Sequence, residues 1–163
     1  MAMPRAAVAA AGLVALALLI ALALMLWPLR PGVLALQFAA TPRAFGAVVH
    51  AWGPEGLALY RAHLPWDFAL LGAYAVFGWL LARHTALFRP LGARWQTLAA
   101  AALPLAALFD ATENLLHGWL TAAPRFGLGW LYALSASVAA AKWLCLLGFA
   151  GLVCAALLRR DPR

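Results

Sequence analysis

The stretch Asp110-Ala-Thr-Glu-Asn-Leu-Leu-His117 puts two carboxylates, an amide and an imidazole inside an otherwise apolar run. Its polar side chains recur at positions i, i+3, i+4 and i+7, namely Asp110, Glu113, Asn114 and His117. At about 100° per residue, this spacing gathers all four on one helical face, within an arc of about 100°. An ionisable side chain costs about 2.5–3.5 kcal/mol at the centre of a membrane-spanning helix, so it normally faces neighbouring helices and has a partner there. The stretch therefore predicts a buried polar face.

The composition around this stretch is that of a membrane protein. Of the 163 residues, 67% are hydrophobic and 10% are charged, and the mean hydropathy is +0.90, values that exclude an ordinary soluble domain. The net charge of +7 raises the question of nucleic-acid binding. The basic residues, however, are scattered near the ends of apolar runs and form no stripe with a recognition motif. We expect a single integral membrane domain, residues 1–163, with the lipid bilayer as its partner and no nucleic acid.

Four apolar runs are long enough to cross a hydrocarbon core about 30 Å thick. We place the spans at about residues 6–27, 65–82, 96–117 and 129–158, which predicts an all-α fold, a four-transmembrane-helix bundle. The first run is longer than the apolar core of a signal peptide, about 7–15 residues, and no small-residue cleavage site follows it. We therefore expect a retained anchor.

The long connection between the first two spans is too interrupted to cross a membrane and too apolar for a free loop. Thr41 and Pro42 have the form of an N-cap and a first helical residue, which predicts a short helix over about 42–52. A second short helix is expected over about 54–63, before Pro65 opens the second span. Both pieces are amphipathic and are predicted to lie at the membrane interface. The pattern is compatible with a lid over the bundle and equally with simple packing between spans.

The distribution of arginines predicts the orientation. If the N-terminus is cytoplasmic, the short cytoplasmic segments hold Arg5, Arg83, Arg89, Arg94, Arg159, Arg160 and Arg163. The positive-inside rule then places both termini in the cytoplasm, and we expect a bacterial-type inner (plasma) membrane. In this orientation the polar stretch lies in the outer half of the third span, with His117 at its rim.

A cationic partner for the polar stretch is available on the fourth span. We expect Lys142 to pair with Asp110, because each would otherwise be an isolated charge within the bundle. Asp67 and Tyr74, seven residues apart on the second span, can face the same cavity. Each also has a simpler explanation, since Asp67 suits the positive end of the helix dipole and Tyr74 suits an apolar core with a satisfied hydroxyl.

Two carboxylates one turn apart in a low-dielectric site suit acid–base chemistry, because they do not both ionise without compensation. The first hypothesis is therefore a membrane-embedded enzyme acting on a lipid or isoprenoid-like substrate. Its catalytic groups would be Asp110, Glu113 and Lys142, and its binding groups would be Asn114, His117, Asp67 and Tyr74.

Two other functions fit the same residues. If the polar network only fixes helix packing, the protein would be a structural or assembly subunit of a membrane complex. If the network moves protons or ions, the protein would be a proton- or ion-coupled carrier, for which a homo-oligomer is one possible form. No metal site is expected, because Glu113 and His117 have no second pair of ligands on another helix. No cofactor is implied, and whether the protein is an enzyme is left open by the sequence.

Overall fold

The computed structural model describes residues 5–123 and 125–159, and these ranges are all-α. The long helices are α1 (Arg5–Leu26), α3 (Pro42–His84), α4 (Ala93–Leu120) and α5 (Gly129–Leu158). The short elements are α2 (Val33–Gln37) and the 3₁₀ turns η1 (Arg89–Leu91) and η2 (Phe126–Leu128). The prediction of an all-α bundle with four long apolar helices is confirmed.

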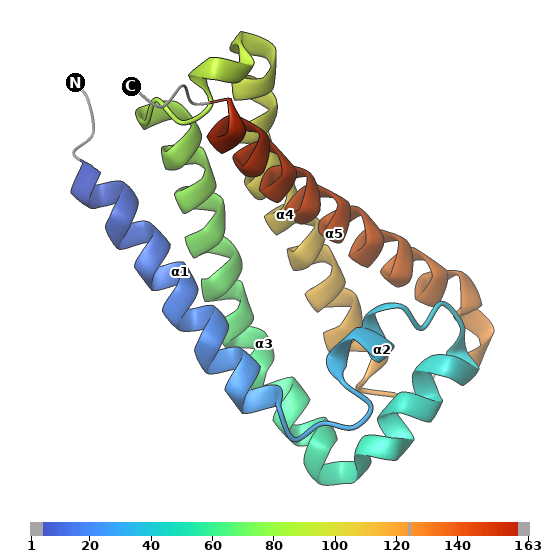
Figure 1. The fold of residues 1–163 in the computed structure, drawn as a ribbon. Coiled ribbons are helices and arrows are strands. Elements are labelled where there is room, and N and C mark those ends of the chain that lie inside the picture. The colour runs from blue at the N-terminus through green and yellow to red at the C-terminus, as the bar shows by residue number, and fades with distance from the viewer. Residues whose placement is uncertain (1–4, 124, 160–163) are drawn as a thin grey trace.

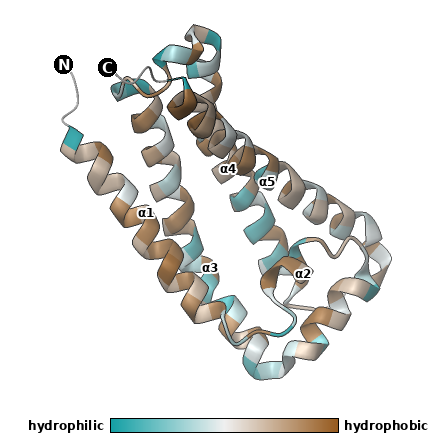
Figure 2. Cartoon of the chain, in the orientation of Figure 1, coloured by the Kyte–Doolittle hydropathy of each residue, from teal (hydrophilic) through white to brown (hydrophobic). Residues whose placement is uncertain are grey.

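Each of these four helices is long and apolar enough to cross a membrane. Their outward faces carry large apolar side chains, such as Leu13 on α1 and Leu144 on α5, which are 67% and 71% exposed. Figure 2 shows apolar residues along α1 and most of α5, whereas hydrophilic residues gather on the middle of α4. A surface of this kind is unfavourable in water and suited to lipid. The structure therefore suggests an integral membrane protein.

The long helices are arranged in the order α1, α3, α4, α5, each in contact with the next. α1 and α5 form the two edges, and no extensive contact joins them among the described residues. In Figure 1 the α1/α3 pair and the α4/α5 pair diverge from the end where α1 begins and α5 finishes. At the wider end the first part of α3 crosses between the pairs, and α2 lies between them.

The first part of α3 follows the sequence prediction. Thr41 is its N-cap, and the Thr41 Oγ1 accepts a hydrogen bond of 3.2 Å from the backbone N–H of Ala44. Gly53 ends this part with φ 65° and ψ −176°, a conformation that is nearly restricted to glycine. The chain turns sharply there, so the predicted helix over 42–52 is present as a separate segment.

Beyond Gly53 the structure differs from the prediction. The expected loop helix over 54–63 and the expected span over 65–82 form one uninterrupted helical run, with Pro65 in its interior. Proline removes only one backbone hydrogen bond, and helices of membrane proteins tolerate that loss where neighbouring groups compensate. The second long helix therefore begins about three turns earlier than predicted, which brings residues 54–63 into the bundle.

Two apolar clusters enclose the polar part of α4. One lies at the wider end and contains the aromatic residues Phe45, Trp52, Tyr60 and Tyr132. The other lies at the narrow end, where Phe88 and Phe149 pack with ring centroids 5.9 Å apart. At that end α3 and α4 approach so closely that a Cβ at Gly78 would lie 2.6 Å from Leu103.

Candidate functional site

The centre of the bundle holds a buried ion-pair network between α4 and α5. Lys142 Nζ on α5 lies 3.0 Å from Asp110 Oδ1 and 2.7 Å from Glu113 Oε2, both on α4. The side chains of Lys142, Asp110 and Glu113 are 5%, 11% and 1% exposed. The predicted pairing of Lys142 with Asp110 is confirmed, and the lysine also bridges to the second carboxylate. Compensation of this kind is required, because an unpaired charge in such surroundings is very costly.

Two side chains from α3 complete the polar centre. Tyr74 Oη donates a hydrogen bond of 3.1 Å to Asp110 Oδ2. Asn114 Nδ2 donates a hydrogen bond of 2.7 Å to Asp67 Oδ2. The structure thus brings Asp67 and Tyr74 to the polar face of α4, as the seven-residue spacing indicated. These hydrogen bonds join α3 to α4, so three helices share one network.

His117 lies deeper than the sequence indicated. We predicted a position at the rim of the bundle, but the side chain is 0% exposed. The prediction was wrong because the first part of α3 covers this end of α4, where Phe45 makes an edge contact with the His117 ring at a centroid distance of 5.5 Å. His117 Nδ1 shares a hydrogen bond of 2.6 Å with Tyr60 Oη and lies 3.8 Å from Glu113 Oε1.

Sequence reasoning missed Tyr60 and His63 as site residues. Both side chains are buried, at 1% and 5% exposure, and the His63 Nδ1 hydrogen-bonds the backbone carbonyl of Tyr60. A signal was present, since a continuous helix through Pro65 places Tyr60, His63, Asp67 and Tyr74 within an arc of about 60°. The assumed helix break at Pro65 concealed it.

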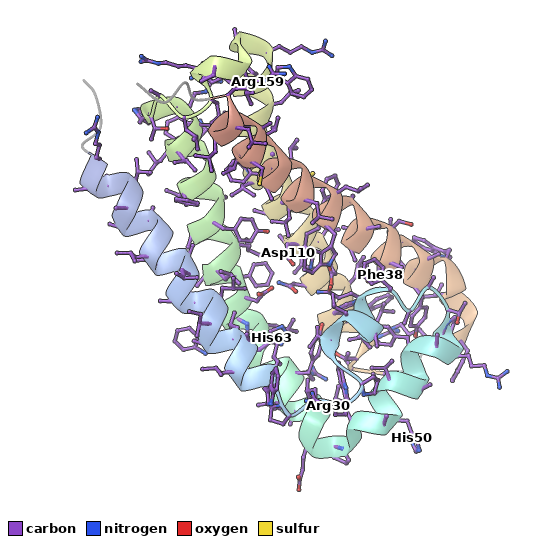
Figure 3. The ribbon with its side chains drawn as sticks, viewed as in Figure 1. Arg30, Phe38, His50, His63, Asp110 and Arg159 are labelled. Atoms are coloured by element: carbon purple, nitrogen blue, oxygen red, sulfur yellow. The ribbon has the colours of Figure 1, made fainter. Side chains whose placement is uncertain are left out.

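A cavity of about 780 Å³ lies against this network. Most of its wall is apolar and comes from α1, α3 and α5. Its polar lining residues are Arg30, Gln37, Tyr60, His63, Asp67, Tyr74, Asp110, Asn114 and Lys142. Figure 3 marks Asp110 and His63 in the middle of the molecule, between α1 and α5. A large apolar space with a few convergent polar groups is the usual form of a small-molecule site.

The cavity divides the predicted site residues into two groups. Asp110, Asn114 and Lys142 line it, together with Asp67 and Tyr74. Glu113 and His117 are not part of the lining and lie behind it, where Glu113 contacts Lys142. A molecule in the cavity would therefore touch Asp110 directly, whereas Glu113 would act on it only through Lys142.

The floor of the cavity near the wider end is built from the segment that follows α1. Trp52 Nε1 donates a hydrogen bond of 2.6 Å to the Pro31 carbonyl, which anchors this segment to α3. Trp143 Nε1 donates a hydrogen bond of 3.0 Å to Gln37 Oε1, which ties α2 to α5. α2 thereby closes one end of the space between the helix pairs.

No group of three or more His, Cys, Asp or Glu side chains within residues 5–123 and 125–159 is arranged to hold a metal ion. Comparison with known proteins finds no family model, no curated protein and no solved structure that matches this chain. The chemistry open to the site is that of its own groups: proton transfer by a carboxylate beside a fixed ammonium, and binding of a polar group next to a long apolar wall.

Proposed function

We propose that this protein is an integral membrane enzyme that binds an amphipathic, lipid-like substrate and transfers a proton at the substrate's polar part. The observation that carries this proposal is the cavity of about 780 Å³, which is apolar along α1 and ends against Asp110 and Lys142. A cavity of this size accommodates a drug-sized or lipid-sized ligand. A network whose only purpose was helix packing would need no such space beside it.

The proposed setting is a bacterial-type inner membrane with both termini in the cytoplasm. The arginine distribution supports this orientation through the positive-inside rule. The polar centre then lies in the outer half of the membrane, with the first part of α3 near the outer surface. In this setting the edges formed by α1 and α5 face lipid, and a substrate enters from the bilayer between them.

In the proposed reaction Asp110 is the catalytic residue, because it is the carboxylate in contact with the cavity. Tyr74 Oη and Lys142 Nζ hold its two oxygens at 3.1 and 3.0 Å, which fixes the carboxylate in one orientation. Asp110 takes a proton from the substrate and returns it at a second position, so the step requires no oxidant or reductant. Glu113 and His117 are positioning residues that hold Lys142 and Tyr60.

The binding part of the proposal is tested by lipid analysis of purified protein. Ala23 on α1 lines the cavity, whereas Ala21, two residues earlier, does not. Ala23→Phe should fill part of the cavity and deplete a specific co-purified lipid, and the matched control Ala21→Phe should retain it. The same lipid content in wild type and both variants would contradict the proposed binding site.

The chemical part is tested by hydrogen exchange into the lipid. After incubation of the co-purified lipid with protein in deuterated water, mass spectrometry measures deuterium bound to carbon. Wild type should incorporate deuterium, and Asp110→Asn should lose most of this activity while keeping its circular dichroism spectrum. Failure of wild-type protein to incorporate deuterium above a protein-free control would refute proton transfer.

A second function is supported by one specific observation. Lys142 is saturated by two carboxylates, and the hydrogen bonds of Tyr74 and Asn114 join α3 to α4. A closed network of this kind suits a structural subunit in which buried polar groups set helix register. This function predicts that Ala23→Phe changes neither bound lipid nor assembly, whereas variants of Lys142 reduce the yield of folded protein.

A further inference from the structure

The polar wall of the cavity has few hydrogen-bond donors left for a ligand. Lys142 Nζ is engaged by two carboxylates at 3.0 and 2.7 Å. The Tyr74 hydroxyl proton is directed to Asp110, and the Asn114 amide group donates to Asp67. A carboxylate only accepts, so both of these donor assignments follow from the partner. These contacts use the Tyr74 hydroxyl proton, two of the three N–H groups of Lys142 and one of the two amide N–H groups of Asn114.

Acceptors, in contrast, remain open on the same wall. His63 Nδ1 contacts a backbone carbonyl, which only accepts, so Nδ1 carries the proton and Nε2 of the neutral ring is an acceptor. No hydrogen-bond partner of this Nε2 is found in the described part of the chain, although the His63 side chain is only 5% exposed and lines the cavity. Asp67 follows one turn later on α3 and also lines the cavity.

The charges of the side chains around the cavity also favour a ligand that donates hydrogen bonds. The polar centre contains three carboxylates, those of Asp67, Asp110 and Glu113, and the Lys142 ammonium pairs with those of Asp110 and Glu113. Asp67 has the neutral Asn114 amide as its partner, and within residues 5–123 and 125–159 no basic side chain lies within 4.0 Å of its carboxylate. The Asp67 carboxylate is half-buried, and a partly desolvated carboxylate with only a neutral partner favours a cation nearby.

Arg30 is the other basic residue at the cavity, but its guanidinium is engaged by the segment that follows α1. Its Nη1 donates to the carbonyls of Trp27 and Leu29 at 2.6 and 2.8 Å. Its guanidinium also lies 5.4 Å from the centre of the Trp27 ring. Arg30 is thus bound to the segment after α1 and is an exposed residue.

We propose that the amphiphile held in this cavity carries a protonated amine as its polar group, seated between Asp67 and His63. The ammonium donates to the Asp67 carboxylate and to His63 Nε2, and the apolar chain extends along α1 and α5. This inference rests on the proposed function, since it names the substrate class of the same site. It excludes carboxylic acids and phosphate monoesters, whose negative charge would meet Asp67.

The test is a binding series on the full chain in a neutral maltoside detergent at neutral pH. The probes share one twelve-carbon chain: dodecylamine, dodecanol, N-dodecylacetamide and dodecanoate. Binding is measured by native mass spectrometry in pairwise competition. The net charge of +7 attracts dodecanoate and repels dodecylamine without a specific site, so non-specific electrostatics works against the expected result.

Dodecylamine should bind wild type about ten-fold more tightly than dodecanol or the acetamide, because charge-assisted hydrogen bonds are about twice as strong as neutral ones. Asp67→Asn should remove this preference, so that dodecylamine binds no more tightly than dodecanol to the variant. The matched control Glu55→Gln removes an exposed carboxylate that does not line the cavity, so the preference should survive. If Asp67→Asn does not fold, the comparison of the four probes on wild type still tests whether the site prefers an amine.

The failures of the inference and of the proposed function are distinguishable. In one outcome, wild type binds dodecylamine and dodecanol equally, or prefers dodecanoate, and Ala23→Phe weakens the binding of every probe. This outcome would overturn the proposed amine group and leave the cavity as a lipid site. A preference for amine that persists in Asp67→Asn would also overturn it. Binding that is indifferent to Ala23→Phe would overturn both.

Discussion

Replacement of Lys142 by methionine tests the electrostatic core of this structure. The substitution keeps the length and apolar stem of the side chain but removes the cation that lies 3.0 Å from Asp110 and 2.7 Å from Glu113. Both carboxylates remain buried and one turn apart on α4. Removal of one partner from a buried ion pair costs about 3–5 kcal/mol, because the remaining charge is uncompensated. We expect a loss of this size in the free energy of unfolding.

The same reasoning predicts a rescue. Asp110→Asn and Glu113→Gln in the Lys142→Met background remove the stranded charges while preserving the shape of the cluster. The triple variant should therefore be more stable than Lys142→Met alone by about 2 kcal/mol or more, since a neutral network is often no worse than a buried ion pair. Leu144→Met on the exposed face of α5 is the matched control and should change stability by less than about 0.5 kcal/mol.

The assay is unfolding from maltoside into dodecyl sulfate micelles, followed by circular dichroism at equilibrium. If Lys142→Met lost less than about 1 kcal/mol, or if the triple variant were no more stable than the single one, the lysine would not be compensating two buried carboxylates. The account of the polar centre would then be refuted.

Three further substitutions are checked by the same unfolding assay. Tyr74→Phe removes the hydrogen bond to Asp110 and should cost about 1.5–3 kcal/mol; a neutral effect would show that the bond contributes nothing. Gly78→Ala should cost about 1–3 kcal/mol, because its Cβ would lie 2.6 Å from Leu103. In the control Gly72→Ala the new Cβ meets nothing within 4 Å, so this variant should stabilise α3 by about 0.5–1 kcal/mol. Equal effects of the two substitutions on stability would contradict the close approach of α3 and α4. Gly53→Ala should cost about 1–3 kcal/mol because of its φ of 65° and ψ of −176°, and a stabilised variant would mean that α3 does not turn there.

The pairing of Lys142 with Asp110 could be predicted from the sequence alone. Lys142 and Asp110 are isolated charges on long apolar runs, and burial leaves such groups few alternatives to each other. The helical period then placed Asp67 and Tyr74 on one face. These inferences rest on periodicity and on the cost of burying charge, which hold without knowledge of the packing.

The remaining features depend on information that periodicity does not contain. Whether Pro65 starts a helix or lies inside one is decided by the packing around it, so Tyr60 and His63 were assigned to the surface. The depth of His117 depends on where the first part of α3 crosses the bundle. Which carboxylate faces the cavity depends on the rotation of α4 against α5, and this rotation places Asp110 at the cavity and Glu113 behind it.

Photo-crosslinking tests most directly the central claim that an amphiphile occupies the space between α1 and α5. The probe is dodecylamine with a diazirine at the end of its chain, and peptide mapping identifies the labelled residues. Labelling should concentrate on cavity residues such as Leu19 and Leu146 and decrease with excess unlabelled dodecylamine. Label spread evenly over outward residues such as Leu24 and Leu144, without competition, would contradict the claim.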